Sequence, residues 1–417
     1  MLQGTRIKAQ TNVALPFTFI IYALFAFLFA QLIILLQTDV FMSGIFRIPP
    51  IWMASHLLVL GFALMVVFGA MYQLVPVALL TPIYSERLGF VQLGVTLVGV
   101  TMLAIFLGIA PQYALYGGII TVIGVSLFLL NMFLTILQQK NKNIITAFVI
   151  AALLSLFVTI VCGLLLVINI VTGFLRVHDP LLFSHMTFGL VGTFSLIIFA
   201  FSYQLVPMFS LAHGHKNQWA KTACILYVSG MMTTIVSFWF SNENMLLFLI
   251  GNGLLLLGFC AFLADIYDML KNRLRKRLDK SFSFSILAIC FGFVCHVFAF
   301  GLAALQITSV RTWGILIAAY TMTWIIFSIL GYLNKIVPVL WWTHKYAEQI
   351  GKEKVPTLQE MTNEQLNTIL FLLFIISFFL FIVGLLLTLK GVAVFAQFIF
   401  TLTAFTYVAS LLRVFSK

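Results

Sequence analysis

Histidines inside apolar segments are the residues of this chain with the clearest capacity for chemistry. Three pairs share a spacing of nine residues between an arginine and a potential metal ligand: Arg47 and His56, Arg176 and His185, Arg311 and Tyr320. Nine helical residues cover about 13 Å. The imidazoles would therefore lie within the hydrocarbon of a membrane, where an ionisable group is a functional hypothesis by default.

A haem standing between helices needs this combination of residues. An imidazole nitrogen binds the iron axially, and cations near the rim pair with the propionates. Small residues follow both histidines, at Gly61, Gly189 and Gly192, and would make room for a porphyrin. The alternative is structural: buried histidines also hydrogen-bond between helices, small residues permit close packing, and arginines snorkel to headgroups.

Two further residues extend the set of candidate ligands. His296 lies in an apolar segment at a comparable depth, and it would supply a second axial ligand or belong to a copper site. Tyr320 replaces histidine in the third pair; a tyrosinate can ligate haem iron, but a buried tyrosine more often donates one hydrogen bond and packs. On that interpretation the third position has lost a metal role.

The pairs belong to a threefold internal repeat. Each is followed by a similar phrase: Tyr-Gln-Leu-Val-Pro ending at Pro76, the same phrase ending at Pro207, and Asn-Lys-Ile-Val-Pro ending at Pro338. The prolines are 131 residues apart in both intervals. A fixed period indicates repeated structural units, which we predict at approximately 1–142, 143–279 and 280–417.

The composition places the repeats in a membrane. With 63% hydrophobic and 8% charged residues, the chain is predicted to be an all-α integral membrane protein. Twelve transmembrane helices, arranged as three rotationally related sets of four, are expected at 13–36, 51–80, 89–110, 113–138, 144–172, 180–211, 218–240, 244–270, 281–306, 311–342, 366–389 and 391–413. The five cysteines fall in apolar runs and form neither a disulfide framework nor a CxxC motif.

The formal net charge of +12 orients the chain and does not indicate a nucleic-acid partner. Of the Lys and Arg residues in loops and tails, eighteen fall on the side of the termini, including Arg6 and Lys8, and four fall on the other side. Basic loops stay in the cytoplasm. We therefore predict a multi-pass protein of the cell membrane with both termini cytoplasmic.

Twelve spans in three sets of four, with histidines on the second and sixth, resemble subunit I of the haem-copper oxidase superfamily, which includes nitric oxide reductases. The stretch from His56 to Pro76, with its Phe68-Gly69-Ala70 run, is similar to the family's second helix. The resemblance implies that His56 is a low-spin haem ligand and that His185 occupies a copper-ligand position. Two features depart from the family: the tenth span has no histidine before His344, and no adjacent His-His pair is present.

These residues lead to an expected function with open alternatives. The expected protein binds haem b through His56 with His185 or His296, and copper is a further possible cofactor. Its role would be electron transport or limited redox chemistry with nitric oxide or oxygen, as a divergent oxidoreductase supplied by quinol or a redox partner subunit. The alternatives are a non-catalytic protein that handles haem or copper as a transporter, chaperone or sensor, and a cofactor-free relic.

Overall fold

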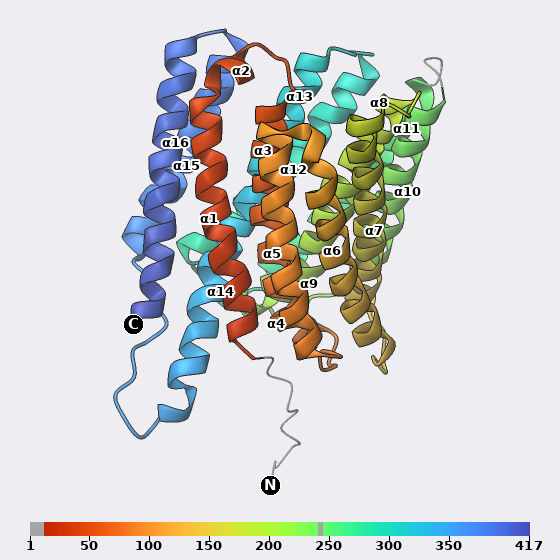
Figure 1. Cartoon of the computed structure of the whole chain (residues 1–417). Coiled ribbons are helices and arrows are strands. Elements are labelled where there is room, and N and C mark those ends of the chain that lie inside the picture. The colour runs from red at the N-terminus through yellow and green to blue at the C-terminus, as the bar shows by residue number, and fades with distance from the viewer. Residues whose placement is uncertain (1–11, 241–244) are drawn as a thin grey trace.

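Twelve helices long and apolar enough to cross a membrane form the part of the chain that the computed structural model describes, residues 12–240 and 245–417 (Figure 1). The all-helical, twelve-span prediction is confirmed, and the chain is a multi-pass membrane protein in contact with the lipid bilayer. Arg6, Lys8 and the first residue of the predicted span 244–270 lie outside the described residues. Nine spans consist of a single α-helix apart from short 3-10 turns at some ends: α1 (Ala14–Leu36), α5 (Glu86–Ile109), α6 (Ala114–Leu137), α7 (Ile144–Thr172), α10 (Ala220–Trp239), α11 (Met245–Lys271), α12 (Lys280–Ala304), α15 (Glu364–Leu386) and α16 (Lys390–Leu412).

The second, sixth and tenth spans each change from α-helix to π-helix and back. Their parts are α3 (Pro49–His56), η1 (Leu57–Leu64) and α4 (Met65–Ala78); α8 (His178–Met186), η3 (Thr187–Ser195) and α9 (Leu196–Ser210); and α13 (Val310–Ala319), η4 (Tyr320–Ile326) and α14 (Phe327–Tyr346). In their apolar cores 67%, 56% and 67% of the residues are buried, against 33–50% in the other nine spans of the described chain. These three are therefore the inner helices of the bundle.

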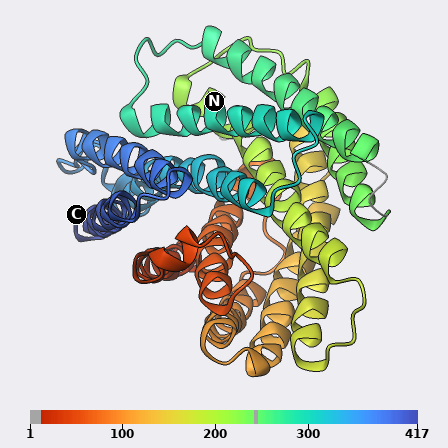
Figure 2. The ribbon, with the colours of Figure 1, turned by 90° about the horizontal axis from the view of Figure 1, so that it is seen from above.

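The remaining spans surround the inner helices, and the end of the chain returns to its beginning. Figure 2 shows the colours following one another round the bundle until the last helices reach the first. The contact between α16 and α1 includes a hydrogen bond between buried amides: Gln397 on α16 donates from Nε2 to Oε1 of Gln31 on α1 over 3.1 Å. Both side chains are buried. Amides buried in an apolar medium need such partners, so this pair stabilises closure of the ring.

Side-chain caps fix where several spans begin. Ser85, Asp279, Ser309 and Asn363 each accept a hydrogen bond from the backbone N–H three residues later. Asn143 forms a reciprocal capping box with Thr146 at the start of α7. Such caps satisfy N–H groups that a helix start leaves without partners. They therefore define the first residue of each of these helices.

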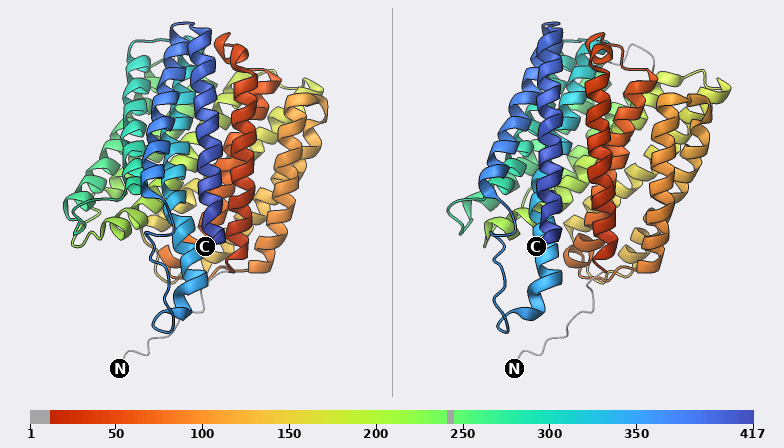
Figure 3. Two further views of the ribbon diagram at one scale, coloured as in Figure 1. Left: turned by 90° about the vertical axis from the view of Figure 1, so that its left-hand side faces the viewer. Right: turned by 60° about the vertical axis from the view of Figure 1, so that its left-hand side comes forward.

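The tenth span is longer than the apolar segment predicts. It continues through α14 and a 3-10 turn to Gln349, and Figure 3 shows its light-blue end projecting beyond the other helices. Pro338 does not end this helix, which runs on to Tyr346. Hydropathy marks only the part of a helix that lies in lipid, whereas polar residues continue the backbone hydrogen bonds into water. Trp342 Nε1 then donates to the carbonyl of Pro356 over 2.6 Å and anchors the following loop.

Two equivalent polar contacts lie near the end of the bundle that carries Pro76 and Pro207, which we term the proline end. On α6, Asn131 accepts from the backbone N–H of Ser85 over 3.1 Å and donates to Oη of Tyr72 over 3.2 Å. In the second set, the carboxylate of Asp265 accepts from the N–H of Trp219 over 3.1 Å and from Tyr203 Oη over 3.0 Å. An amide and a carboxylate thus perform the same structural task.

This equivalence predicts that two substitutions of Asp265, which is 2% exposed, differ in their effect on stability. Asp265→Leu leaves the Trp219 N–H and the Tyr203 hydroxyl without an acceptor, at about 1–3 kcal/mol for each group. Asp265→Asn keeps an acceptor for Trp219, as Asn131 does for Ser85, and should lie within about 1 kcal/mol of the parent. Thermal unfolding in detergent measures both. Equal losses of stability in the two variants would contradict the assignment.

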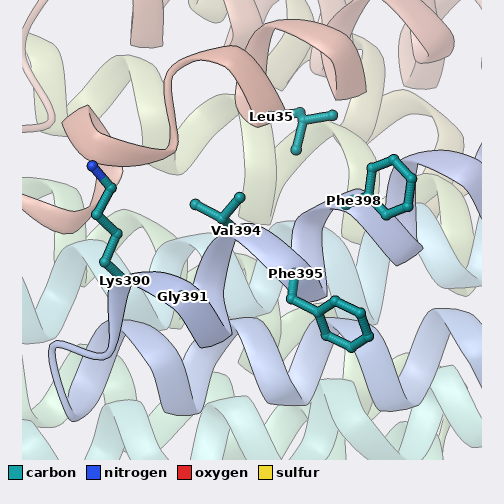
Figure 4. Close-up of a pocket in the computed structure, with 6 residues that line it drawn as sticks. All are labelled: Leu35, Lys390, Gly391, Val394, Phe395 and Phe398. Carbon is teal, nitrogen blue, oxygen red and sulfur yellow. The ribbon is translucent and has the colours of Figure 1, made fainter.

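One shallow groove opens on the lipid-facing surface, near the opposite end of the bundle, and does not involve the candidate site. Figure 4 shows it between α1 and α16. The lining residues are Leu35, Lys390, Gly391, Val394, Phe395 and Phe398. Lys390 is paired with Asp39 of α2 (Thr38–Met42) over 2.8 Å. The exposed Phe395 and Phe398 are suited to contact with lipid acyl chains.

Candidate metal centre

His56 is the last residue of α3 and precedes the π-helical segment η1. Its Nδ1 lies 2.7 Å from the carbonyl oxygen of Trp52, one turn earlier. A carbonyl only accepts, so Nδ1 carries the proton and donates. In the neutral ring Nε2 then holds a lone pair, which is the tautomer that binds a metal through Nε2.

His185 on α8 is held in the same tautomer by a different helix. Its Nδ1 lies 2.9 Å from the carbonyl oxygen of Thr159 on α7. The same edge of the ring faces Gly163, where an added Cβ would come within 3.0 Å of Cε1. Gly163 therefore leaves space that the imidazole occupies, and α7 sets the orientation of His185.

The rings of the two histidines lie close together in the interior. Their ring centroids are 6.5 Å apart and their planes are inclined by 20°. A bond between an imidazole nitrogen and a metal is about 2 Å long, so two imidazoles on opposite sides of one metal ion have centroids about 6 Å apart. The ring spacing, and the Nε2 lone pair that each tautomer leaves, are compatible with one shared metal atom.

The inner helices differ along their length in how tightly they pack. Toward the end that carries Arg47, which we term the arginine end, α3 buries only Ile51 and Ala54 and α8 only Leu181 and Ser184, while α13 buries no residue. Most residues of α4 and α9, at the proline end, are buried. The half of the bundle that contains the histidine pair is therefore the half in which fewer residues of the inner helices are buried.

The three arginines have different environments. Arg47 Nη1 is 2.7 Å from Oδ1 of Asp179, so an ion pair joins the ends of the two histidine-bearing spans. Arg311 Nη2 donates to the carbonyl of Leu385 over 2.7 Å. Arg176 is exposed and has no ion-pair or hydrogen-bond partner within residues 12–240 and 245–417. Only Arg176 thus has its whole guanidinium available for a further anion.

His296 and Tyr320 are in a separate cluster. The His296 ring contacts Tyr227 and Phe259, with centroid separations of 5.6 and 4.6 Å. Nδ1 lies 2.7 Å from the carbonyl of Gly292 and Nε2 lies 3.0 Å from Tyr227 Oη, so both nitrogens have protein partners. Tyr320 belongs to the same hydrogen-bonded group. The structure thus brings His56 and His185 together. His296 and Tyr320 instead share a hydrogen-bond partner, the hydroxyl of Tyr227.

The glycines that the sequence suggested as room for a porphyrin serve helix packing. A Cβ on Gly61 would meet Ala26 of α1 at 2.8 Å, and one on Gly192 would meet Ser155 at 2.6 Å. Gly189 makes an ordinary contact with Thr159. These glycines allow close approach between helices. The glycine that does border a candidate ligand is Gly163, on a helix that carries no candidate ligand.

Several residues at the centre were missed by sequence reasoning. Asp179, Thr159 and Gly163 each contact a candidate residue from another helix, and only the isolated Gly163 in an apolar run offered a local signal. Within the described chain, no group of three or more His, Cys, Asp or Glu side chains converges as a metal site would require. A copper proposal therefore rests on the same two histidines as a haem proposal.

The comparison with known proteins supports the architecture. A heme-copper terminal oxidase, determined as a dimer by cryo-electron microscopy, is similar to this chain with a TM-score of 0.70 and 13% sequence identity, over 98% of this chain and 85% of the other. No family model and no curated protein sequence matches this chain. The chain therefore has a haem-copper oxidase subunit I-like fold, as the spacing of its spans and histidines indicated.

Proposed function

We propose that the protein binds haem b, with His56 and His185 as the two axial ligands of one iron, and that it transfers electrons. The observation that carries the proposal is the paired geometry: ring centroids 6.5 Å apart, with each Nδ1 bonded to a backbone carbonyl. Bound haem supplies a one-electron iron couple. Because both imidazoles would be bound to the iron, electron transfer would be favoured over a reaction of oxygen or nitric oxide there.

The surrounding residues position the ligands. The carbonyls of Trp52 and Thr159 fix the tautomers and increase the basicity of both imidazoles, as partners of metal-bound histidines do. Arg176, with Arg47 beside Asp179, offers positive charge to carboxylates at the arginine end. We assign the first propionate contact to Arg176, because Arg47 and Arg311 already have partners.

The orientation in the cell belongs to this proposal. The excess of Lys and Arg on the side of the termini favours a cell-membrane protein with both termini in the cytoplasm. The end of α1 from which the chain enters the bundle and the C-terminus lie at the same end (Figure 1), as an even number of spans requires. The histidine pair would then lie nearer the outer face, where a quinol or a redox partner subunit would deliver electrons.

The second candidate is a non-catalytic protein that carries or senses haem or copper. The limited ligand set favours it, since two imidazoles without a third donor can hold a metal that is later released. The sparse packing of the inner helices at the arginine end favours a large planar group over a single copper ion.

The absorption spectrum of the purified protein tests haem binding. Protein from haem-replete cells should show a Soret band and sharp reduced α bands. Colourless protein without haem would refute the proposal, and stoichiometric copper in that protein would establish the second candidate. Where haem is present, reduction by quinol supports electron transfer; a haem that quinol does not reduce and that passes readily to apo-acceptors supports the carrier.

Gly163→Val should disturb the centre without removing a ligand. The new side chain would occupy the space of the His185 ring, whose Cε1 and Nδ1 lie 3.0 and 3.3 Å from an added Cβ. We expect a change from the six-coordinate spectrum of two histidines to that of one. The control is Gly94→Val on α5, where an added Cβ has no neighbour within 4 Å. Identical spectra for the two variants would contradict the assigned position of His185.

A further inference from the structure

A chain of hydrogen bonds crosses the interior beside the proposed haem site and is not explained by it. It connects four spans through side chains that are almost completely buried, apart from the half-buried Tyr320. Its members are Ser195 on η3, Tyr227 on α10, His296 on α12, and Tyr320 and Trp324 on η4. Placing polar and ionisable groups in the hydrocarbon costs free energy, so a buried group of this kind is a candidate functional site.

The His296 end of the chain has a defined proton arrangement when the imidazole is neutral. Nδ1 lies 2.7 Å from the Gly292 carbonyl, which can only accept, so Nδ1 carries the single ring proton. Nε2 therefore accepts, and the hydroxyl of Tyr227, 3.0 Å away, must donate to it. The direction of every following bond is set by this first one.

Each hydroxyl has one proton, and so the direction propagates. Tyr227 has used its proton, hence its oxygen accepts from Tyr320 over 3.1 Å. Tyr320 in turn accepts from Ser195 over 2.5 Å. The oxygen of Ser195 accepts from Trp324 Nε1 over 2.9 Å. In this arrangement Ser195 has no proton left for the carbonyl of Leu190, which lies 3.1 Å from its Oγ.

A proton added at His296 reverses the chain. Nε2–H then donates to Tyr227, Tyr227 donates to Tyr320, and Tyr320 donates to Ser195. Ser195 is released to donate to the Leu190 carbonyl, five residues earlier in the π-helix η3. Three hydrogen bonds change direction and a fourth forms, while every polar group keeps a partner. His296, Tyr227, Tyr320 and Ser195 therefore keep hydrogen-bond partners with and without the proton, and the bond from Ser195 to Leu190 is made only with it.

We propose that His296, Tyr227, Tyr320 and Ser195 form an intramembrane proton-binding site whose occupancy is transmitted to the backbone of η3. The neighbours of His296 are compatible with a proton as ligand. Tyr227 and Tyr320 face it from α10 and η4, and α11 presents the Phe259 ring at 4.6 Å. Cys295 beside it is bonded to Thr323.

No Asp, Glu, Lys or Arg of the described chain makes a hydrogen bond or ion pair with these residues. The added charge would thus be stabilised by the oriented hydroxyls. The site needs no haem, so it stands independently of the proposed function.

Infrared difference spectroscopy of the full chain in lipid nanodiscs, titrated with acid over the pH range in which the fold is stable, tests the proposal. The bands of a protonating imidazole should appear at the same pH as a shift in tyrosine C–O bands, because both tyrosines exchange donor and acceptor partners. His296→Gln should abolish the tyrosine shift and the imidazole signal that accompanies it, while the bands of the other six histidines remain. Tyr227→Phe should uncouple the tyrosine shift from the imidazole signal, since the imidazole can still protonate while Tyr320 no longer responds.

Tyr22→Phe is the matched control, because the hydroxyl of Tyr22 bonds to Thr101 and takes no part in the hydrogen bonds that connect His296 to Ser195. It should leave the titration unchanged. The proposal is overturned if the tyrosine bands of the parent protein do not shift in that pH range, if His296→Gln removes no imidazole signal at the pH of that shift, or if the tyrosine shift survives in His296→Gln.

Discussion

Substitution of either His56 or His185 by alanine is expected to remove the six-coordinate haem spectrum, and substitution of both is expected to remove the haem. Each single variant leaves one imidazole, so the iron would retain one axial ligand and lose the sharp reduced α bands. Haem affinity should fall by more than about tenfold, since loss of even an outer-shell partner of a metal ligand costs 10–100-fold. Spectra and haem-to-protein ratios of the purified variants measure this.

Two controls make the result specific for the proposed pair. His344→Ala removes an exposed histidine whose ring lies 6.0 Å from that of Trp341, and its spectrum should be that of the parent. His296→Ala should also retain both axial ligands, because the nitrogens of His296 are bonded to Gly292 and Tyr227. Added imidazole should restore six-coordination in His185→Ala. Haem loss in His296→Ala with normal binding in His185→Ala would refute the pairing.

The positions of the spans were predictable because hydropathy and length report directly on a solvent boundary. The predicted limits of the first span, 13–36, differ by one residue from α1. The same reasoning underestimated the tenth span, since hydropathy does not register a helix that continues into water. The period between Pro76 and Pro207 falls on spans that the structure places inside the bundle. The boundaries of the internal repeats stay a prediction.

The candidate site was less accessible to sequence reasoning. The nine-residue spacing selected His56, His185 and Tyr320 as candidates, and depth within an apolar segment added His296. Which histidines face each other depends on the rotation of each inner helix. The π-helical segments affect that rotation, and no residue preference in the sequence marks them. The neighbours Thr159 and Gly163 come from another span, so their role depends on packing that a single sequence does not reveal.

Trp324→Ala is expected to cause the largest loss of stability of any single substitution considered. Trp324 is fully buried and packs against Phe259 and Phe199, with ring centroids 5.3 and 6.1 Å away. Gly292 lies against the Trp324 ring and has no side chain that could move into the cavity left by the substitution. Removal of a buried aromatic ring costs about 3–5 kcal/mol, and Trp324 also donates to Ser195.

The comparison with Trp324→Phe separates packing from hydrogen bonding. Phenylalanine restores most of the ring but not the N–H, and its cost should be nearer the roughly 1 kcal/mol of one hydrogen bond, plus a small cavity term. Trp219→Ala is the surface control: that side chain is 51% exposed and its loss should cost within about 0.5 kcal/mol. Thermal unfolding of the three variants in one detergent gives the order. Because Trp324 joins η4 to η3 and α12, a loss in Trp324→Ala no larger than in Trp219→Ala would mean that the inner helices do not pack through this residue.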